Sequence, residues 1–309
     1  MPGRLAILCP GQGAQSGAMF DMARTDPGAR ALLDAWFGDP ALAAVLAATR
    51  DDDARFTNRV AQPSIVAATL ALWAALAPGV QTPALVAGYS IGELSAYGVA
   101  GAIAHGDALK LARARARLMD ACLDSATPQA MVALSGLTQA AIGGLLERCG
   151  FHPAILTGDD SLVAGGLAEN GQALADAAQA AGGKATILPV AVASHTPLLQ
   201  HAVAPFAGLL QGVRWTAPAF PVLSGISAEP VVEAGKAIAE LPRQIAEPIR
   251  WKECMDALAE SGATVALELG PGAALSRMLQ ARHPLIACRS VSEFRSLDGV
   301  RSWLDRNLE

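Results

Sequence analysis

The sequence has few charged residues, few aromatic residues and few cysteines. Charged residues make up 17% of the 309 positions and aromatic residues 5%, against 52% hydrophobic residues, a composition that excludes an intrinsically disordered chain. The formal net charge is -5 and no run of lysine or arginine occurs, so we expect no nucleic acid and no anionic membrane as a partner. The five cysteines form no CxxC or other metal-ligand spacing, which predicts no metal site and a reducing, cytoplasmic location.

A hydrophobic segment long enough to cross a bilayer is also missing. No charged residue lies between Arg59 and Glu93, but the apolar part of this stretch, residues 65–77, ends at Pro78 and is shorter than the ~20 residues that a spanning helix needs. The apolar region before Gly11 is too short for a signal peptide. We therefore expect a buried helix at 65–77 and a protein that stays in the cytoplasm.

At both ends of the chain, short apolar runs alternate with helix-compatible stretches. Four of these runs are candidate strands, at residues 5–9, 84–87, 264–269 and 286–288. The first three end in a turn that contains glycine or proline. Helical patterns follow the second and third of these runs, at 93–99 and 273–280. Strands that alternate with helices predict a mostly parallel sheet covered on both faces.

The middle of the chain follows a different order. Its strand patterns are residues 131–134, 154–157, 162–164 and 185–190. One helical pattern begins after Thr138 and ends at Gly150, and an Ala-rich one runs from about Leu167 to Gly182; a flexible linker is the alternative for the second, but its length and its glycine stop favour a helix. The order β-α-β-β-α-β is typical of a ferredoxin-like fold.

We therefore predict an α/β fold with two parts. Residues 1–126 and 191–309 would form a large, α/β-hydrolase-like parallel-sheet domain, and residues 127–190 an inserted ferredoxin-like subdomain.

Residues 88–92 match the pattern GxSxG, with a strand pattern before them and a helical pattern after them, which is the context of a nucleophile elbow. In so tight a turn the positions two before and two after the serine crowd each other, which explains the two glycines. Ser90 would stand at a helix N-terminus, where the N–H of Ile91 can stabilise an oxyanion. The alternative is a serine that only caps the helix, but the flanking patterns favour a nucleophile.

A serine nucleophile needs a base, and His195 is the best candidate among the five histidines. It follows the apolar run 187–193, which we interpret as a strand that delivers the imidazole to the top of a sheet. A structural or exposed histidine is the alternative. His201 is interpreted as a helix or surface residue.

Two further segments offer polar groups. Residues 11–15 (GQGAQ) match neither a P-loop nor a dinucleotide-binding motif; their glycines could bring the amide of Gln12 to the site, although a plain loop is equally consistent. Arg113, Arg115 and Arg117 alternate and would spread around a helix, so at most one can face a ligand carboxylate.

Taken together, five segments resemble the malonyl-CoA:acyl-carrier-protein transacylase family. They are residues 10–15, residues 88–93, Arg115 with Met119, residues 194–195 and residues 268–272. The resemblance spans nearly the whole chain, the motifs occur in the right order, and the inserted ferredoxin-like subdomain is also a feature of that family.

The resemblance implies a role for each matched position. Ser90 would be the nucleophile, and His195 would be the general base and then the general acid. The backbone carbonyl of Gln244 would orient the imidazole, and the backbone of Gln12 and Ile91 would form the oxyanion hole. Arg115 would bind the free malonyl carboxylate. The implied reaction passes malonyl from malonyl-CoA to the serine and then, with ping-pong kinetics, to the phosphopantetheine thiol of an acyl carrier protein. No cofactor is implied.

The sequence also departs from the family pattern. Tyr89 stands where histidine is usual, Asp120 where glutamine is common, and residues 158–161 lack an Asn-containing turn. These departures indicate a specialised relative, such as the malonyl-transferring subunit of malonate decarboxylase or a stand-alone acyltransferase of a polyketide pathway.

Two alternatives from other classes stay open. A serine hydrolase or thioesterase would need an acid between Ser90 and His195, and the acids considered there, Asp159, Asp160 and Asp176, fall in the inserted segment. A non-catalytic module that docks a carrier protein would keep the serine and histidine only as relics.

Overall fold

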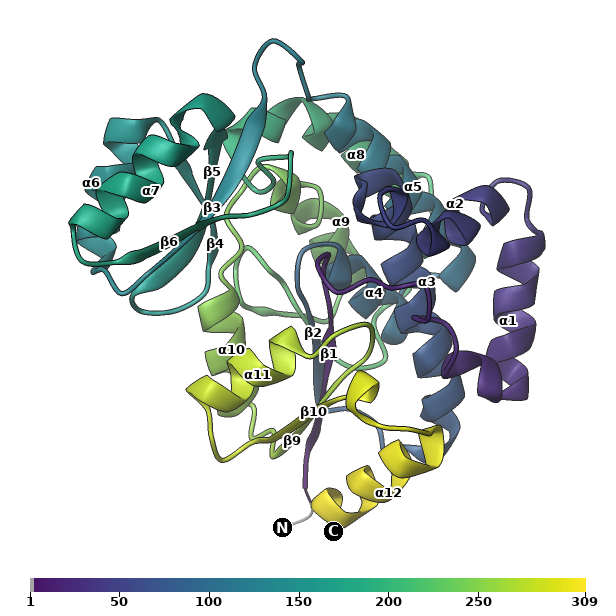
Figure 1. The fold of residues 1–309 in the computed structure, drawn as a ribbon. Helices are drawn as coiled ribbons and strands as arrows, with labels where there is room; N and C mark the ends of the chain where they lie inside the picture. The colour runs from purple at the N-terminus through teal and green to yellow at the C-terminus, as the bar shows by residue number, and fades with distance from the viewer. Residues whose placement is uncertain (1–2) are drawn as a thin grey trace.

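Two sheets organise the chain, which a computed structural model describes over residues 3–309 (Figure 1). The larger sheet has six strands in the order β10-β9-β1-β2-β7-β8. Its strands are β1 (Leu5–Cys9), β2 (Leu85–Gly88), β7 (Val222–Leu223), β8 (Pro230–Val231), β9 (Val265–Glu268) and β10 (Ala287–Ser290). All neighbours in this sheet are parallel except the last pair, β7 and β8.

Helices cover both faces of this sheet (Figure 1). They are α1 (Pro27–Gly38), α2 (Ala43–Ala47), α3 (Asn58–Leu76), α4 (Ile91–Val99), α5 (His105–Asp120), α8 (Gln200–Gln211), α9 (Ala234–Glu240), α10 (Trp251–Glu260), α11 (Ala274–Arg282) and α12 (Leu297–Leu308). Strand β1 is buried along its whole length. Leu5 and Ile7 pack in the core that includes α3 and α4, whereas Ala6 and Leu8 pack in the core that includes α10 and α11. A strand that is covered on both faces has a continuous run of apolar residues, and the sequence of β1 is such a run.

Helix α3 contains the buried helix expected at 65–77. It is long and apolar enough to cross a membrane, but 83% of its most apolar window is buried inside the protein. It packs against α1, α4 and α5, so its hydrophobic surface is used within the core.

The smaller sheet is antiparallel, with the order β4-β5-β3-β6. Its elements are β3 (Gln129–Ser135), α6 (Gln139–Cys149), β4 (His152–Leu156), β5 (Ser161–Leu167), α7 (Gly171–Ala180) and β6 (Lys184–Ile187). Thr138 caps α6 by accepting a hydrogen bond from Ala141 N, and Gly150 ends it with φ +67°. The predicted fold class, a parallel-sheet core with an inserted ferredoxin-like segment, is confirmed; the domain limits at 126/127 and 190/191 stay a prediction.

The end of the smaller sheet corrects the sequence interpretation. Strand β6 stops at Ile187, and residues 188–194 are irregular, so the run 187–193 is not a strand that leads to His195. Pro189 has no N–H to continue the ladder. Beyond it, Val190 N donates to Leu188 O and Ser194 N to Val192 O, which turns the chain back on itself.

The turn between β2 and α4 is pressed against the end of β1. A Cβ added at Gly88 would lie 2.2 Å from Glu93 N, and one added at Gly92 would lie 2.1 Å from Cys9 O. Both contacts are with backbone atoms, which cannot move aside as a side-chain end can.

We predict that Gly92→Ala destabilises the fold by at least about 2 kcal/mol, at the upper end of ordinary overpacking, because the new methyl group meets the backbone of a buried strand. The matched control is Gly143→Ala in α6, where an added Cβ meets nothing within 4 Å; it should stabilise the protein by roughly 0.5–1 kcal/mol through helix propensity. Denaturant unfolding of both variants measures the difference, and similar values for the two would contradict the steric account.

Candidate active site

Ser90 occupies a strained position between β2 and α4. Its backbone has φ +56° and ψ -119°, far from the regions that a non-glycine residue prefers, and it forms the N-cap of α4. Glycine-rich residues after β1 lie against it, since a Cβ at Gly11 would be 3.7 Å from Ser90 Cβ. The serine side chain is therefore held at the carboxyl end of the sheet and is only half-buried.

His195 meets this serine across 105 positions of sequence. Ser90 Oγ and His195 Nε2 are 2.8 Å apart, and His195 Nδ1 is 2.5 Å from the backbone oxygen of Gln244. A carbonyl oxygen only accepts, so Nδ1 carries the proton and Nε2 is left to accept the hydrogen bond from the serine hydroxyl. The backbone of His195 also has positive φ, +64°, and its N–H donates to Ile245 O.

The imidazole is uncharged at neutral pH. Burial, together with the nearby positive charge of Arg115, lowers the pKa of His195 to about 3, against the raising effect of the hydrogen bond to the Gln244 carbonyl. A neutral imidazole that accepts a hydrogen bond from a hydroxyl is able to take its proton.

Of the three alternating arginines on α5, the structure buries only Arg115. Its side chain is 1% exposed, whereas Arg113 is half-buried and Arg117 exposed. Its guanidinium donates to two amide oxygens, Gln62 Oε1 at 2.8 Å and Gln244 Oε1 at 3.2 Å. Burial lowers the pKa of Arg115 to about 10, so it stays charged at neutral pH.

Glu93 and Gln62 are site residues that the sequence interpretation missed. Glu93 lies on the first turn of α4, is 1% exposed, and its Oε2 accepts from Gly225 N at 3.0 Å and Gln244 Nε2 at 2.5 Å. Burial raises the pKa of Glu93 to about 7, against the lowering effect of these two donors. The signal in the sequence was weak in both cases, because each is a polar residue on a helix that is largely, but not wholly, apolar.

The two residues expected to form the oxyanion hole lie beside the serine. Ile91 is the first residue of α4, where an N–H has no acceptor within the helix. Gln12 directly follows Gly11 and is half-buried. The loop that carries Gln12 is supported by residues 270–272, because a Cβ at Gly270 would lie 2.5 Å from Pro10 Cγ and one at Gly272 would touch Ala14 Cβ.

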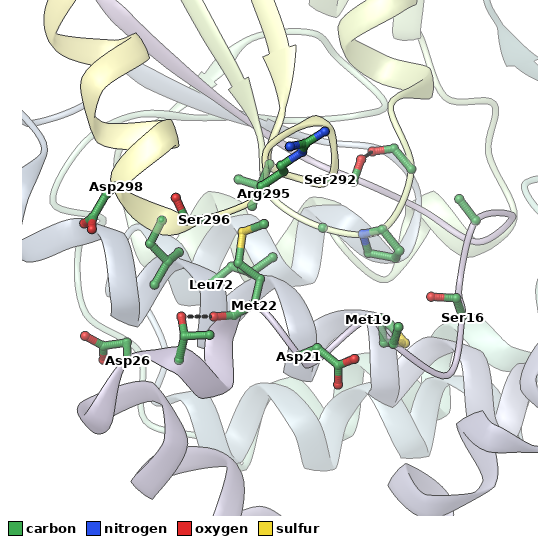
Figure 2. A pocket seen from close by; sticks show the side chains of 18 of the residues that line it. Ser16, Met19, Asp21, Met22, Asp26, Leu72, Ser292, Arg295, Ser296 and Asp298 are labelled. Atoms are coloured by element: carbon green, nitrogen blue, oxygen red, sulfur yellow. Dashed lines mark hydrogen bonds between the residues drawn. The ribbon is translucent and has the colours of Figure 1, made fainter.

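A separate cavity of about 700 Å³ is lined in part by the loop that carries Gln12 and by residues 270–272 (Figure 2). Residues 270–272 and Ser16 line it together with Met19, Met22 and Arg295. Ser90, His195 and Arg115 are not among its lining residues, so this cavity is distinct from the serine–histidine site.

The acids in the inserted segment do not approach His195. Asp159 is exposed and pairs with Lys252 at 2.8 Å and Arg282 at 3.1 Å, and Asp160 and Asp176 are exposed as well. The imidazole faces a backbone carbonyl instead of a carboxylate. The acid that a Ser-Asp-His hydrolase requires is therefore not supplied by these three residues.

The structure thus brings Ser90, His195, Gln244 and Arg115 into one bonded cluster. Their chemical roles, like those of Gln12 and Ile91, stay predictions at this point.

Comparisons with known proteins match nearly the whole chain to acyl transferases. A family model described as the acyl transferase domain matches residues 7–293. The malonyl CoA-acyl carrier protein transacylase of Mycobacterium tuberculosis is 32% identical over 299 residues, which cover 95% of this chain and 98% of that protein. The Escherichia coli K12 protein of the same name is 30% identical over 285 residues, which cover 88% and 91%.

Solved structures agree as well. The malonyl CoA-acyl carrier protein transacylase from Coxiella burnetii matches with a TM-score of 0.91 and 27% identity, over 100% of this chain and 99% of that one. A malonyl-transacylase solved in complex with a type II PKS acyl-carrier protein matches with a TM-score of 0.90 and 27% identity, over 98% and 100%.

We predict that His195 makes the protein acid-sensitive in a defined window. Its pKa is about 3 in the folded state against 6.5 for an ordinary histidine, so below pH 6.5 the unfolded state binds a proton that the folded state does not, and stability falls as pH falls. Relative to His195→Asn, a residue that tolerates positive φ, the wild type should lose roughly 2 kcal/mol of unfolding free energy between about pH 7.5 and 5.

Denaturant unfolding of both proteins across this range measures the difference. Glu93 is present in both, so its own titration cancels. Parallel stability curves would show that the buried imidazole takes up a proton in the folded protein.

Proposed function

Because the chain belongs to the acyl transferase family, we propose that it transfers a malonyl group from malonyl-CoA to the phosphopantetheine thiol of an acyl carrier protein, through an ester on Ser90. The observation that carries the proposal is the shared partner Gln244. Its backbone oxygen accepts from His195, which contacts Ser90, and its side-chain oxygen accepts from Arg115. A nucleophile, a base and a carboxylate-binding cation are thereby joined in one cluster.

The first half-reaction acylates the serine. His195 Nε2 takes the proton of Ser90 Oγ as that oxygen attacks the thioester carbonyl of malonyl-CoA. The backbone N–H groups of Ile91 and Gln12 stabilise the tetrahedral oxyanion. The C–S bond then breaks, the CoA sulfur receives the proton from His195, and CoA leaves as a thiol.

The second half-reaction discharges the serine to the carrier. The phosphopantetheine thiol gives its proton to His195 Nε2 and attacks the ester carbonyl, and the C–O bond to Ser90 breaks as its oxygen recovers that proton. Each product leaves before the other substrate reacts, so the kinetics are ping-pong. The imidazole must be neutral at the start of each half, which fits its lowered pKa.

Arg115 selects the acyl group. A guanidinium binds a carboxylate through two parallel, charge-assisted hydrogen bonds, and both present partners of Arg115 are neutral amides. The free carboxylate of a malonyl group can therefore pair with a charge that no carboxylate of the described residues contacts directly. A neutral acyl group would leave this buried charge without a carboxylate in direct contact.

The departures from the family pattern bear on the carrier and the pathway. Tyr89 packs edge-on against Trp251, with ring centroids 5.2 Å apart, and Asp120 accepts from Asn58 and Arg59, each at 2.9 Å. The departures themselves, rather than these contacts, keep a specialised enzyme of a polyketide pathway and the malonyl-transferring subunit of a malonate decarboxylase as alternatives to fatty-acid synthesis. A panel of carrier proteins decides among them, and the cytoplasm stays the expected location.

We predict that mixing the protein with malonyl-CoA adds the mass of one malonyl group, and that Ser90→Ala abolishes this gain. Ser95→Ala is the matched control, because Ser95 is a buried serine of α4, the helix that follows Ser90, and its hydroxyl has no hydrogen-bond partner among residues 3–309. Intact-mass spectrometry reads both variants. An adduct that survives in Ser90→Ala would remove the proposed nucleophile.

Discharge of this adduct separates transfer from hydrolysis. The carrier thiol should remove the malonyl group much faster than water does, whereas faster loss to water would indicate a hydrolase. No adduct on the wild type would indicate a relic.

We predict that Arg115→Ala lowers kcat/KM for malonyl-CoA far more than it lowers transfer of a neutral acyl group. Losing one partner of a buried charge pair costs roughly 2–5 kcal/mol of binding. Arg117→Ala, on the same helix but exposed, is the control and should leave the preference between donors unchanged. Steady-state kinetics with both donors measure the preference, and equal losses for the two donors would rule out the selective role of Arg115.

A further inference from the structure

The side chain of Gln244 stands between two buried, opposite charges. Its NH₂ group donates to Glu93 Oε2 at 2.5 Å and to Ser90 O at 3.2 Å, and its Oε1 accepts from Arg115 at 3.2 Å. Glu93 and Arg115 are each 1% exposed. Among residues 3–309 no ion pair joins these two groups.

This separation is unusual for charges so well buried. A carboxylate and a guanidinium removed from water normally pair directly, because direct contact offsets part of their desolvation cost. Direct pairing here would fill the guanidinium fork with a protein carboxylate. An amide is the side-chain group that can satisfy both partners at once, since it donates at one end and accepts at the other while carrying no charge.

Building on the proposed function, we propose that the Gln244 side chain is a specificity-determining spacer, which keeps the Glu93 carboxylate out of the Arg115 fork so that a substrate carboxylate can enter it. Glu93 still acts on the guanidinium through space, because its charge raises the pKa of Arg115 against the effect of burial. With the spacer in place, the negative charge of Glu93 still stabilises the Arg115 guanidinium electrostatically. The Glu93 carboxylate does not, however, compete with the substrate carboxylate for the guanidinium.

The surroundings hold Glu93 on its side of the spacer. Gly225 N donates to Glu93 Oε2 at 3.0 Å, and a Cβ at Gly225 would lie 2.8 Å from the same oxygen. Glycine at 225 therefore lets the backbone N–H reach the carboxylate. Tyr97 OH, 3.5 Å from Oε1, is a weaker partner on the same helix.

Gln62, which binds the other arm of the guanidinium, is the control residue for Gln244. It accepts from Arg115 at 2.8 Å, and its own NH₂ group lies 3.5 Å from Asn58 Oδ1 and 3.4 Å from Met119 Sδ. Gln62 has no bond to Glu93. Loss of Gln62 removes a hydrogen bond from Arg115 without releasing a carboxylate toward it.

The first variant is Gln244→Met, which keeps the backbone carbonyl that accepts from His195 and replaces the amide with an unbranched side chain. Without the spacer, Glu93 and Arg115 can pair directly. We expect KM for malonyl-CoA to rise about tenfold to a hundredfold, the range for one hydrogen bond to a charged group, and to rise more than kcat falls. Assays at about pH 8 keep Glu93, whose pKa is about 7, in its charged form.

The deciding measurement is rescue by a second substitution. Adding Glu93→Gln to Gln244→Met removes the competing carboxylate and should recover most of the lost affinity for malonyl-CoA. The control pair is Gln62→Met with and without Glu93→Gln, in which we expect no recovery. If Gln244→Met does not fold, Gln244→Asn, whose shortened amide cannot bridge both groups, takes its place.

Rescue confined to the Gln244 pair supports the spacer, because a purely structural role would not be repaired by removing a further buried hydrogen-bonding charge. Absence of rescue, or equal rescue in both pairs, overturns it. The activity of the wild type distinguishes a failure of the spacer proposal from a failure of the proposed function. If the wild type transfers malonyl selectively and rescue fails, only the spacer is wrong; if the wild type does not transfer malonyl, the proposed function itself is wrong.

Discussion

The contact between the first turn of α4 and the carboxyl end of β1 is the constraint on which the site depends. Gly92 passes so close to Cys9 O that no side chain fits, and Tyr89 N donates to the same oxygen at 3.0 Å. Because β1 and β2 are parallel neighbours, the loop after one strand lies beside the turn after the other. The serine and the loop with Gln12 therefore meet at one edge of the sheet, and the positive φ of Ser90 follows from the sharpness of this turn.

Neutral groups connect the charged groups of this site. The imidazole is oriented by a backbone carbonyl, and each arm of the Arg115 guanidinium is held by an amide oxygen. In a buried setting a direct carboxylate partner of the histidine would favour its protonation, and a direct carboxylate partner of Arg115 would occupy its guanidinium. With neutral partners the imidazole stays unprotonated and the guanidinium stays free of a contacting carboxylate, which are the two conditions that the proposed transfer of an acidic acyl group needs.

Gln244 couples the two halves of the site through a single residue. Its carbonyl belongs to a short helical turn, Arg243–Ile245, and its side chain reaches the first turn of α4 and the middle of α5. The orientation of His195, the proposed base, and the placement of Arg115, the proposed ligand of the acyl carboxylate, are consequently not independent. Under the proposed function, a shift of this turn would change acid-base geometry and donor selectivity together.

The sequence by itself determined the features that rest on local pattern. The buried strands, the GxSxG turn, the Thr138 cap and the Gly150 stop are each encoded within a few neighbouring residues, because strand alternation, glycine conformations and helix caps are short-range effects. His195 was chosen from the five histidines by its place after an apolar run, whereas Arg115 was chosen from three alternating arginines only with help from the resemblance to a family.

Only the tertiary structure decided which polar groups meet. Glu93, Gln62 and the side chain of Gln244 come from three separate segments, and the bonds that link them, directly or through Arg115, cross 53 to 151 positions of sequence. No periodicity records such contacts. The path to His195 was misjudged for the same reason: residues 188–194 look like a strand by composition, but the tertiary contacts leave them irregular, with Ala193 N bonded to the side chain of Gln129. Local chemistry specifies the elements, whereas the pairing of buried charges depends on how those elements pack.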